Sequence, residues 1–170
     1  MSKSIAIAAA LAALLALPAF AHITFENREA EAGSTARLVL RVPHGCEGGA
    51  ATVRIRVRIP DGVVNVKPMP HPGWELTTVR GPLARPVAAE HGAPVSEGVR
   101  EIVWSGRLLD EHYDEFVFRA QLPAEAGMLY FPTVQECERG VNRWIEIPAE
   151  GRSADDYREP APGLRVAPRH

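Results

Sequence analysis

The chain has 170 residues, a formal net charge of −2 at pH 7 and 24% charged residues. This length is enough for one domain with a hydrophobic core and too short for two comfortable ones. The charge is close to neutral, and the basic side chains alternate along strands instead of clustering. Both features argue against a nucleic acid or an anionic membrane surface as the partner.

The first 21 residues have the layout of a secretory signal peptide. Lys3 precedes an apolar run over residues 5–17, and the small-residue pattern Ala-Phe-Ala ends at Ala21. The run is too short to cross a bilayer, and Ala-x-Ala is typical of a signal peptidase site. We therefore predict cleavage after Ala21, which leaves residues 22–170 as one periplasmic or secreted domain that begins with His22.

No second long apolar segment follows, and the C-terminal stretch ending VAPRH is polar. We therefore expect the exported domain to be soluble and to have no membrane anchor. A histidine directly after the cut could also be accidental, because the cleavage motif constrains the next residue only loosely.

Short β-rich runs, separated by Gly, Pro or Asp clusters, follow one another along the chain. The clearest is ATVRIRVRI at 51–59, in which apolar residues and arginines alternate strictly, as in a half-buried strand. The other predicted strands are 36–42, 75–79, 101–105, 115–122, 129–134, 143–147 and a last short one at 164–166. This series predicts an all-β fold, an antiparallel β-sandwich of immunoglobulin-like or cupredoxin-like arrangement.

Three segments between these runs lack strand periodicity. The composition of residues 81–98 predicts a long exposed hairpin loop, and residues 148–162 predict a second loop. KPMPHPGW at 67–74 should run extended into a turn at Gly73. His71 and Met69 within it could bind a metal, but a site needs three or four converging ligands, so a structural role is favoured.

Cys46 and Cys137 are the two cysteines of the chain. In an oxidising compartment an isolated pair favours a disulfide, which would stabilise the fold by roughly 4–5 kcal/mol in the chain-entropy model. The alternative is a dithiolate site for Cu(I), because soft thiolates suit that ion, although the compartment favours oxidation.

An amino-terminal histidine offers a chelate that an internal histidine cannot form. Its α-amine and imidazole Nδ1 close a ring on one metal ion, and Cu(II) prefers such nitrogen donors in a tetragonal plane. Both groups must lose protons to bind, and imidazoles and α-amines have ordinary pKa values of about 6.5 and about 7.7–8. Affinity should therefore fall as the pH drops toward about 5. A carboxylate or a second imidazole would have to complete the plane.

The blocks VPHGC, KPMPHPGW, FPTVQECERG and RWIEIP occur in this order behind an initial AHITFENREAEAG. Together they resemble the YcnI-like copper-binding domain proteins over nearly the whole of residues 22–170. The resemblance implies an exported β-sandwich that binds one Cu(II) ion through a monohistidine brace. It also implies a metallochaperone-like role in copper homeostasis without catalysis, alongside other periplasmic copper chaperones or cuproprotein targets.

By this resemblance His22 supplies both bracing nitrogens, and Trp144 lies close to the metal. An indole face over a cation gives a cation–π contact. Without the resemblance, Trp144 would be interpreted as a buried core residue, because tryptophan usually serves cores.

The acidic ligand transfers less directly. Some relatives carry a glutamate just after the VP of VPHGC, where this chain has Gly45, so Glu47 is our first choice. Glu138 is the second, because a bond between the two cysteines would hold both glutamates in one neighbourhood. His44 is a third candidate, since imidazole suits Cu(II) and would give a two-histidine brace.

Two other functions remain open at this stage. A copper oxygenase of the lytic polysaccharide type also begins with a histidine on a β-sandwich, but it uses a second histidine and a flat aromatic surface. Tyr113, Tyr130 and Tyr157 form no evident platform of that kind. A structural or interaction module with an accidental histidine is the third class. The sequence contains no pattern for hydrolysis or phosphoryl transfer.

Overall fold

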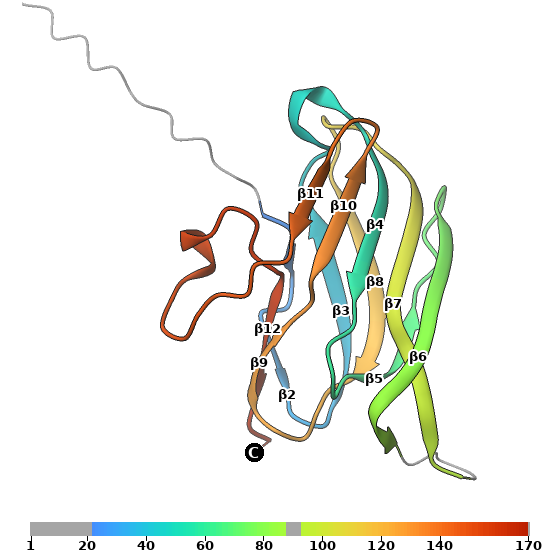
Figure 1. The fold of residues 1–170 in the computed structure, drawn as a ribbon, viewed down its shortest axis with the longest axis vertical. Coiled ribbons are helices and arrows are strands. Elements are labelled where there is room, and N and C mark those ends of the chain that lie inside the picture. The colour runs from blue at the N-terminus through green and yellow to red at the C-terminus, as the bar shows by residue number, and fades with distance from the viewer. Residues whose placement is uncertain (1–21, 88–92, 170) are drawn as a thin grey trace, which may run out of the picture.

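The computed structural model describes residues 22–87 and 93–169, and its strands form three sheets (Figure 1). The predicted signal peptide at 1–21 lies outside the described residues. The strands are β1 (Thr24–Phe25), β2 (Glu29–Glu31), β3 (Thr35–Val42), β4 (Thr52–Arg58), β5 (Val64–Pro68), β6 (Glu75–Val87), β7 (Val95–Leu108), β8 (Asp114–Gln121), β9 (Gly127–Tyr130), β10 (Thr133–Cys137), β11 (Val141–Trp144) and β12 (Gly163–Ala167). Two short 3-10 turns, Glu47–Gly49 and Ala154–Asp156, complete the secondary structure. In the described part, no helix has the length and apolar character needed to cross a membrane.

Two larger sheets form the sandwich, so the predicted all-β architecture is confirmed. One has four strands in the order β1-β3-β8-β5, and the other has five in the order β11-β10-β4-β7-β6. A small third sheet, β2-β12-β9, lies beside them (Figure 1). The pairings are antiparallel except that β12 runs parallel to β2. Strands β1 and β11 are edge strands of different sheets on the same side of the molecule (Figure 1).

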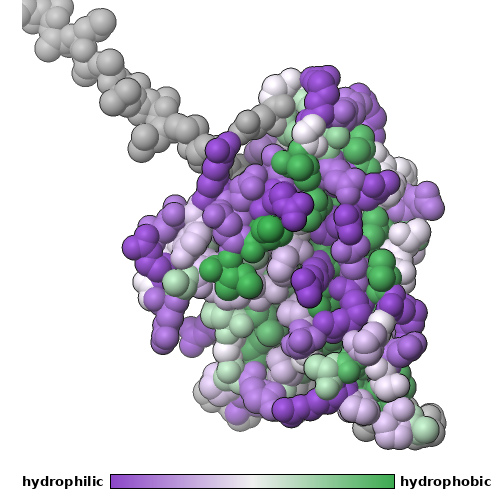
Figure 2. All heavy atoms as spheres, viewed as in Figure 1, coloured by the Kyte–Doolittle hydropathy of each residue, from purple (hydrophilic) through white to green (hydrophobic). Residues whose placement is uncertain are grey.

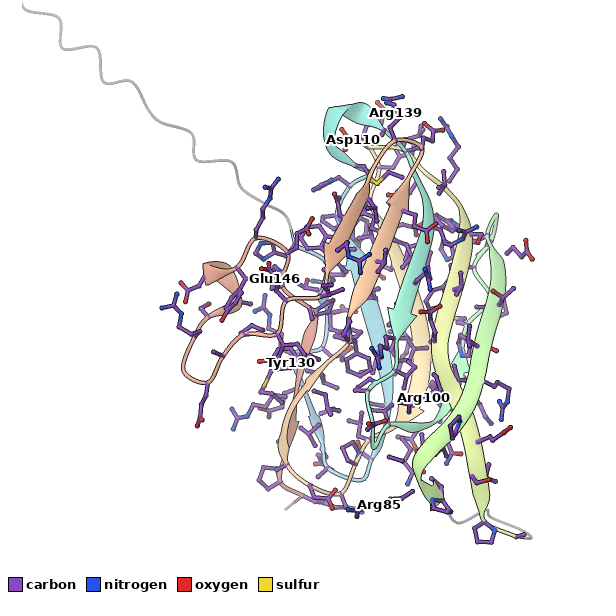
Figure 3. The ribbon with its side chains drawn as sticks, viewed as in Figure 1. Arg85, Arg100, Asp110, Tyr130, Arg139 and Glu146 are labelled. Carbon is purple, nitrogen blue, oxygen red and sulfur yellow. A yellow bond between two sulfur atoms is a disulfide. The ribbon has the colours of Figure 1, made fainter. Side chains whose placement is uncertain are left out.

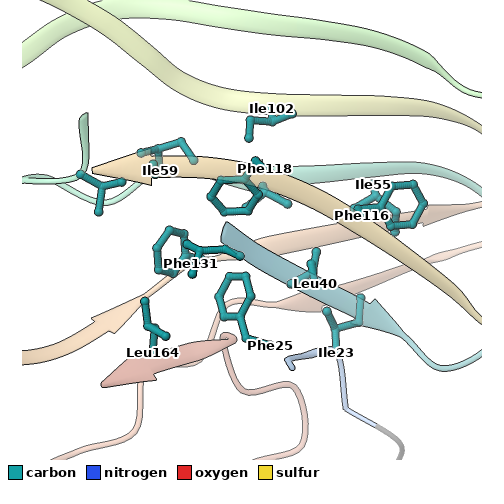
Figure 4. Close-up of a cluster of buried hydrophobic side chains, with 14 of the residues drawn as sticks. Ile23, Phe25, Leu40, Ile55, Ile59, Ile102, Phe116, Phe118, Phe131 and Leu164 are labelled. Atoms are coloured by element: carbon teal, nitrogen blue, oxygen red, sulfur yellow. The ribbon is translucent and has the colours of Figure 1, made fainter. Parts of the chain in front are cut away.

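The alternation in β4 has the predicted consequence. Ile55, Val57 and Ile59 are buried between the sheets, whereas Arg54 and Arg58 point to solvent. Aromatic rings from several strands fill the same core, including Phe25, which makes edge contacts with its neighbours. Figure 4 shows this cluster with β-branched and leucine side chains packed around it. Close-packed apolar burial of this kind is the main stabilising contribution to the fold.

The prediction of a loop over residues 81–98 is wrong at both ends of this range, because both ends are strand. Strand β6 continues to Val87 and β7 begins at Val95, with Pro82 opposite Glu97. This part of the hairpin is largely exposed, so backbone pairing holds it without a hydrophobic period to reveal it. Pro82 is tolerated because β6 is an edge strand, where a missing N–H breaks no ladder.

The single strand predicted for residues 129–134 is two strands. Residues up to Tyr130 pair with β12, whereas Thr133 begins β10 in the five-stranded sheet. Pro132 between them lacks an N–H group, and the chain changes sheet there. The strand predicted at 143–147 ends at Trp144, and Glu146 makes only an isolated bridge to the 148–162 loop.

Several predictions near the ends of strands are confirmed, and some short strands were missed. The turn at Gly73 is present, with φ of 78° and a hydrogen bond from Trp74 N to His71 O of 3.0 Å. Residues 148–162 form the second predicted loop, apart from its short 3-10 turn. Strands β1, β2 and β5 were not predicted, because segments of two to five residues carry too little periodicity.

Candidate metal site

His22 lies two residues before β1, at the edge of the four-stranded sheet. Thr24 pairs with Arg41 in β3, and the Ile23 side chain is buried with 1% exposure. The backbone next to His22 is therefore held by both pairing and packing. His22 itself is half-buried at the surface. The residues that follow His22 therefore hold its imidazole at the edge of the sheet.

Trp144 is the last residue of β11, at the edge of the five-stranded sheet, and pairs with Thr133. Its side chain is buried, with 5% of its surface exposed. The His22 and Trp144 ring centroids are 5.8 Å apart, and the ring planes are inclined at 59°. Within residues 22–87 and 93–169, the His22 ring has no hydrogen-bond partner. The fold therefore places the His22 imidazole, which has no hydrogen-bond partner among the described residues, beside an indole from a distant part of the sequence.

Gln135 is the polar residue behind this pair, and sequence reasoning missed it. It is 1% exposed, and its Oε1 accepts hydrogen bonds from Trp144 Nε1–H at 3.1 Å and Asn142 Nδ2–H at 3.2 Å. Buried Trp N–H groups usually require such an acceptor. The available signal was the alternation of TVQEC, which places Gln135 on the same face as the buried Thr133.

The VPHGC segment is tied to the same glutamine. Gln135 Nε2 donates to the carbonyl oxygens of His44 at 3.1 Å and Gly45 at 3.0 Å. A Cβ on Gly45 would lie 2.7 Å from Asp110 Cα, so a side chain cannot occupy this position. The slot that holds a glutamate in some relatives is therefore sterically closed here. His44 Nδ1 lies 2.8 Å from Gly45 O and 3.7 Å from Asp110 Oδ1, close to its own loop.

The predicted disulfide between Cys46 and Cys137 is present, with Cα atoms 6.1 Å apart. Both cysteines are consumed, so the alternative dithiolate site for Cu(I) does not form. Glu138, next to this bond, accepts a hydrogen bond from Arg107 Nε at 3.1 Å, and this guanidinium lowers the pKa of Glu138 below its ordinary value. The second-choice carboxylate is therefore already paired.

Glu47, the first choice, opens a 3-10 turn directly after Cys46, and its side chain lies outside the described part of the structure. Among the side chains that are described, no three His, Cys, Asp or Glu residues converge on a point that could hold a metal ion. The geometry thus brings His22 and Trp144 together, and their binding of a metal stays a prediction.

A pocket of about 700 Å³ opens beside His22. Its lining includes Tyr130 of β9 and two acidic residues of the 148–162 loop, Glu150 and Asp155. Figure 3 shows Glu146 at the base of this loop and Tyr130 below it. Glu146 closes the base, because its N–H donates to Glu159 O at 3.1 Å and its carboxylate accepts from Glu159 N at 2.6 Å. These two hydrogen bonds therefore hold the base of the loop whose residues line the pocket.

The surface over this edge is amphipathic. Figure 2 shows a mostly hydrophilic face with a band of hydrophobic residues over the end of β11 and the segment that follows. Ile145 and Ile147 are exposed there, Ile147 by 58%. The two isoleucines flank Glu146, in the segment that follows Trp144.

Comparisons with known proteins agree with the fold. A family model described as "Domain of unknown function (DUF1775)" matches residues 22–166. A crystal structure of an uncharacterized protein from Nocardia farcinica, described as having an immunoglobulin-like fold, is similar with a TM-score of 0.64 and 26% identity. The similarity covers 86% of this chain and 98% of that one. No curated protein matches the chain significantly.

Proposed function

The chain belongs to the DUF1775 family, the family of YcnI-like proteins, and we propose that it is an exported protein that holds or delivers Cu(II) through His22. In this proposal signal peptidase exposes the α-amine of His22, and the amine and imidazole chelate the ion together. The match to the family model begins at this residue. The role is binding and transfer within copper homeostasis, not catalysis.

The observation that carries the proposal is the contact between His22 and Trp144. An imidazole without a hydrogen-bond partner in the described structure lies 5.8 Å, centroid to centroid, from a buried indole. An ion chelated at His22 would lie near the indole, and an indole face attracts a cation through the ring quadrupole. Since the chain just after His22 pairs in β1 and Trp144 lies in β11, little ordering would be needed on binding.

The residues present fit copper in part. Imidazole and amine nitrogens are donors that Cu(II) prefers, and the half-buried position limits access by water. The third donor is a proposal that rests on the resemblance: Glu47 follows Cys46, in the segment whose carbonyl oxygens Gln135 binds. Glu138→Gln is the matched control for Glu47→Gln, because Glu138 is paired with Arg107. Loss of affinity in Glu47→Gln alone would support Glu47 as the ligand.

The proposal is tested by titrating two forms of the protein with Cu(II), both beginning at His22, one with a free α-amine and one with that amine acetylated. Acetylation converts the α-amine into an amide and breaks the chelate while leaving the imidazole in place. We expect the affinity to fall by at least about 100-fold, on the order of the 2.7 kcal/mol that two decades represent. Equal affinities would show that the brace does not form.

A further inference from the structure

We propose that Gln135 is a positioning residue for the copper site, which fixes the indole of Trp144 in the orientation that faces His22. The inference rests on the proposed copper-binding function. Gln135 touches neither His22 nor the expected metal position in the contacts described above. It acts through the indole, which it ties to the VPHGC segment.

The hydrogen bonds determine the orientation of the Gln135 amide. The groups on its Oε1 side, Trp144 Nε1–H and Asn142 Nδ2–H, can only donate. The groups on its Nε2 side are oxygen acceptors, namely the carbonyls of His44 and Gly45 and the Thr52 hydroxyl at 2.8 Å. A flipped amide would place donor against donor on one side, so the orientation is unique.

This network is anchored at its far end by the disulfide. Thr52 Oγ1 accepts from Gln135, which leaves its own hydrogen free. Cys46 Sγ lies 3.7 Å from that hydroxyl and carries no hydrogen in the disulfide, so Thr52 is the donor. The chain of contacts therefore runs from the covalent bond through β4 and β10 to the indole on β11.

Burying the Gln135 amide costs free energy, because its polar atoms lose their hydrogen bonds to water. The hydrogen bonds that it forms in the core at best offset this cost. An apolar side chain would fill the space without that cost. What the amide adds is a fixed direction for the Trp144 N–H group, and thus for the ring plane. Without Gln135 the indole N–H would lack its partner, and the ring would be free to turn toward another acceptor.

A cation–π contact depends on the ring face, so rotation of Trp144 should weaken copper binding without touching the chelate. Gln135→Met retains the length of the side chain and removes all of its strong hydrogen bonds. We expect it to weaken Cu(II) binding by about 3- to 30-fold, the range that the loss of one such contact represents. Gln135→Glu retains an acceptor oxygen for the indole and, as the neutral acid that burial against three oxygens favours, also a donor toward the carbonyls, so it should restore most of the affinity.

The experiment is a double-mutant cycle on protein that begins at His22, with the wild type, Gln135→Met, Trp144→Phe and the double variant. Phenylalanine has no ring N–H, so in the Trp144→Phe protein Gln135 cannot form its hydrogen bond to the ring at position 144. We expect each single variant to weaken Cu(II) binding and the double variant to be no weaker than Trp144→Phe. A Gln135→Met protein with wild-type affinity, or losses that multiply in the double variant, would overturn the inference.

Hydrogen exchange of the Trp144 indole N–H in the metal-free protein separates this inference from the proposed function. Protection in the wild type and in Gln135→Glu, but not in Gln135→Met, is expected whether or not copper binds. Equal protection in all three refutes the role of Gln135. His71→Asn, on the β5 side of the sandwich, is the control for a general loss of stability and should leave both readouts unchanged. If Gln135→Met does not fold, Gln135→Glu against wild type decides, and rapid exchange in Gln135→Glu contradicts the inference.

Discussion

The described part of the molecule contains two histidine–tryptophan contacts with almost the same geometry and very different surroundings. The His22–Trp144 centroids are 5.8 Å apart with the rings inclined at 59°, and the His71–Trp74 centroids are 6.2 Å apart at 57°. His71 Nε2 lies 3.0 Å from Asp114 Oδ2, and the side chains of this pair are 21% and 23% exposed. The His22 ring has no such partner in the described residues and opens onto a pocket.

This difference shows that a ring contact alone does not make a metal site. In KPMPHPGW the turn at Gly73 places the two rings together locally, and a carboxylate then occupies one imidazole nitrogen. At the other edge, the chain just before β1 and the end of β11, which belong to different sheets, bring the rings together, and the His22 ring has no hydrogen-bond partner among residues 22–87 and 93–169. Substitutions should therefore affect stability at the first pair and copper binding at the second.

Trp74→Ala should have the largest effect on stability and none on copper binding. Trp74 makes an edge contact with Phe116 at 4.8 Å and lies against Gly106, where an added Cβ would come within 2.4 Å of the indole. We expect a loss of about 2–4 kcal/mol, because removing a large packed ring leaves a cavity. Chemical denaturation followed by circular dichroism measures it. A variant as stable as the wild type would contradict this packing role.

Asp114→Asn should destabilise the protein by about 1–3 kcal/mol, because it leaves His71 without its carboxylate in a mostly buried position. Its Cu(II) affinity should equal that of the wild type. Denaturant midpoints and a copper titration of the same sample check both statements. If copper binding fell together with stability, His71 would belong to the metal site and the contrast between the two pairs would fail.

His22→Ala should give the reverse result. Because the His22 ring makes no hydrogen bond within the described part of the chain, its removal should change the free energy of unfolding by less than about 0.5 kcal/mol. Copper binding should be lost. A stability loss as large as that of Asp114→Asn would show that His22 serves the core.

The smallest effect concerns pH. Arg107 lowers the pKa of Glu138 in the folded state, so the pair contributes stability above the unfolded pKa, and this contribution is lost as the pH falls through the folded value. Glu138→Gln should therefore lower the stability slightly at neutral pH and above, where the pair contributes, and should remove the corresponding loss of stability on the acid side. NMR titration of Glu138, with and without Arg107→Gln, measures the shift. An unchanged titration would contradict the pairing.

The sandwich and the disulfide could be predicted from the sequence because their signals are local or compositional. The alternation in ATVRIRVRI and an isolated pair of cysteines behind a predicted signal peptide were sufficient. The extension of β6 and β7 into the hairpin predicted at residues 81–98 was missed, because largely exposed pairing leaves no hydrophobic period. Residues 129–134 were predicted as a single strand, because the sheet that each half joins is decided by pairing partners far away in the sequence.

The candidate site was predictable only in part, for a related reason. The contact of His22 with Trp144 followed from the resemblance, and the structure supplies its geometry. Gln135 could not be assigned, because a buried polar residue acquires its role from carbonyls and an indole that the chain brings to it from far away. The hydrogen bond between Arg107 and Glu138 could not be predicted from the sequence either.

The most direct test uses the side chains of the three tryptophans of the chain as reporters. Substoichiometric Cu(II) is added to ¹⁵N-labelled protein that begins at His22, and the indole N–H signals are followed by NMR. A paramagnetic ion at His22 should broaden the Trp144 signal first and leave those of Trp74 and Trp104 sharp. Broadening of Trp74 before Trp144 would place copper at His71 and contradict the account.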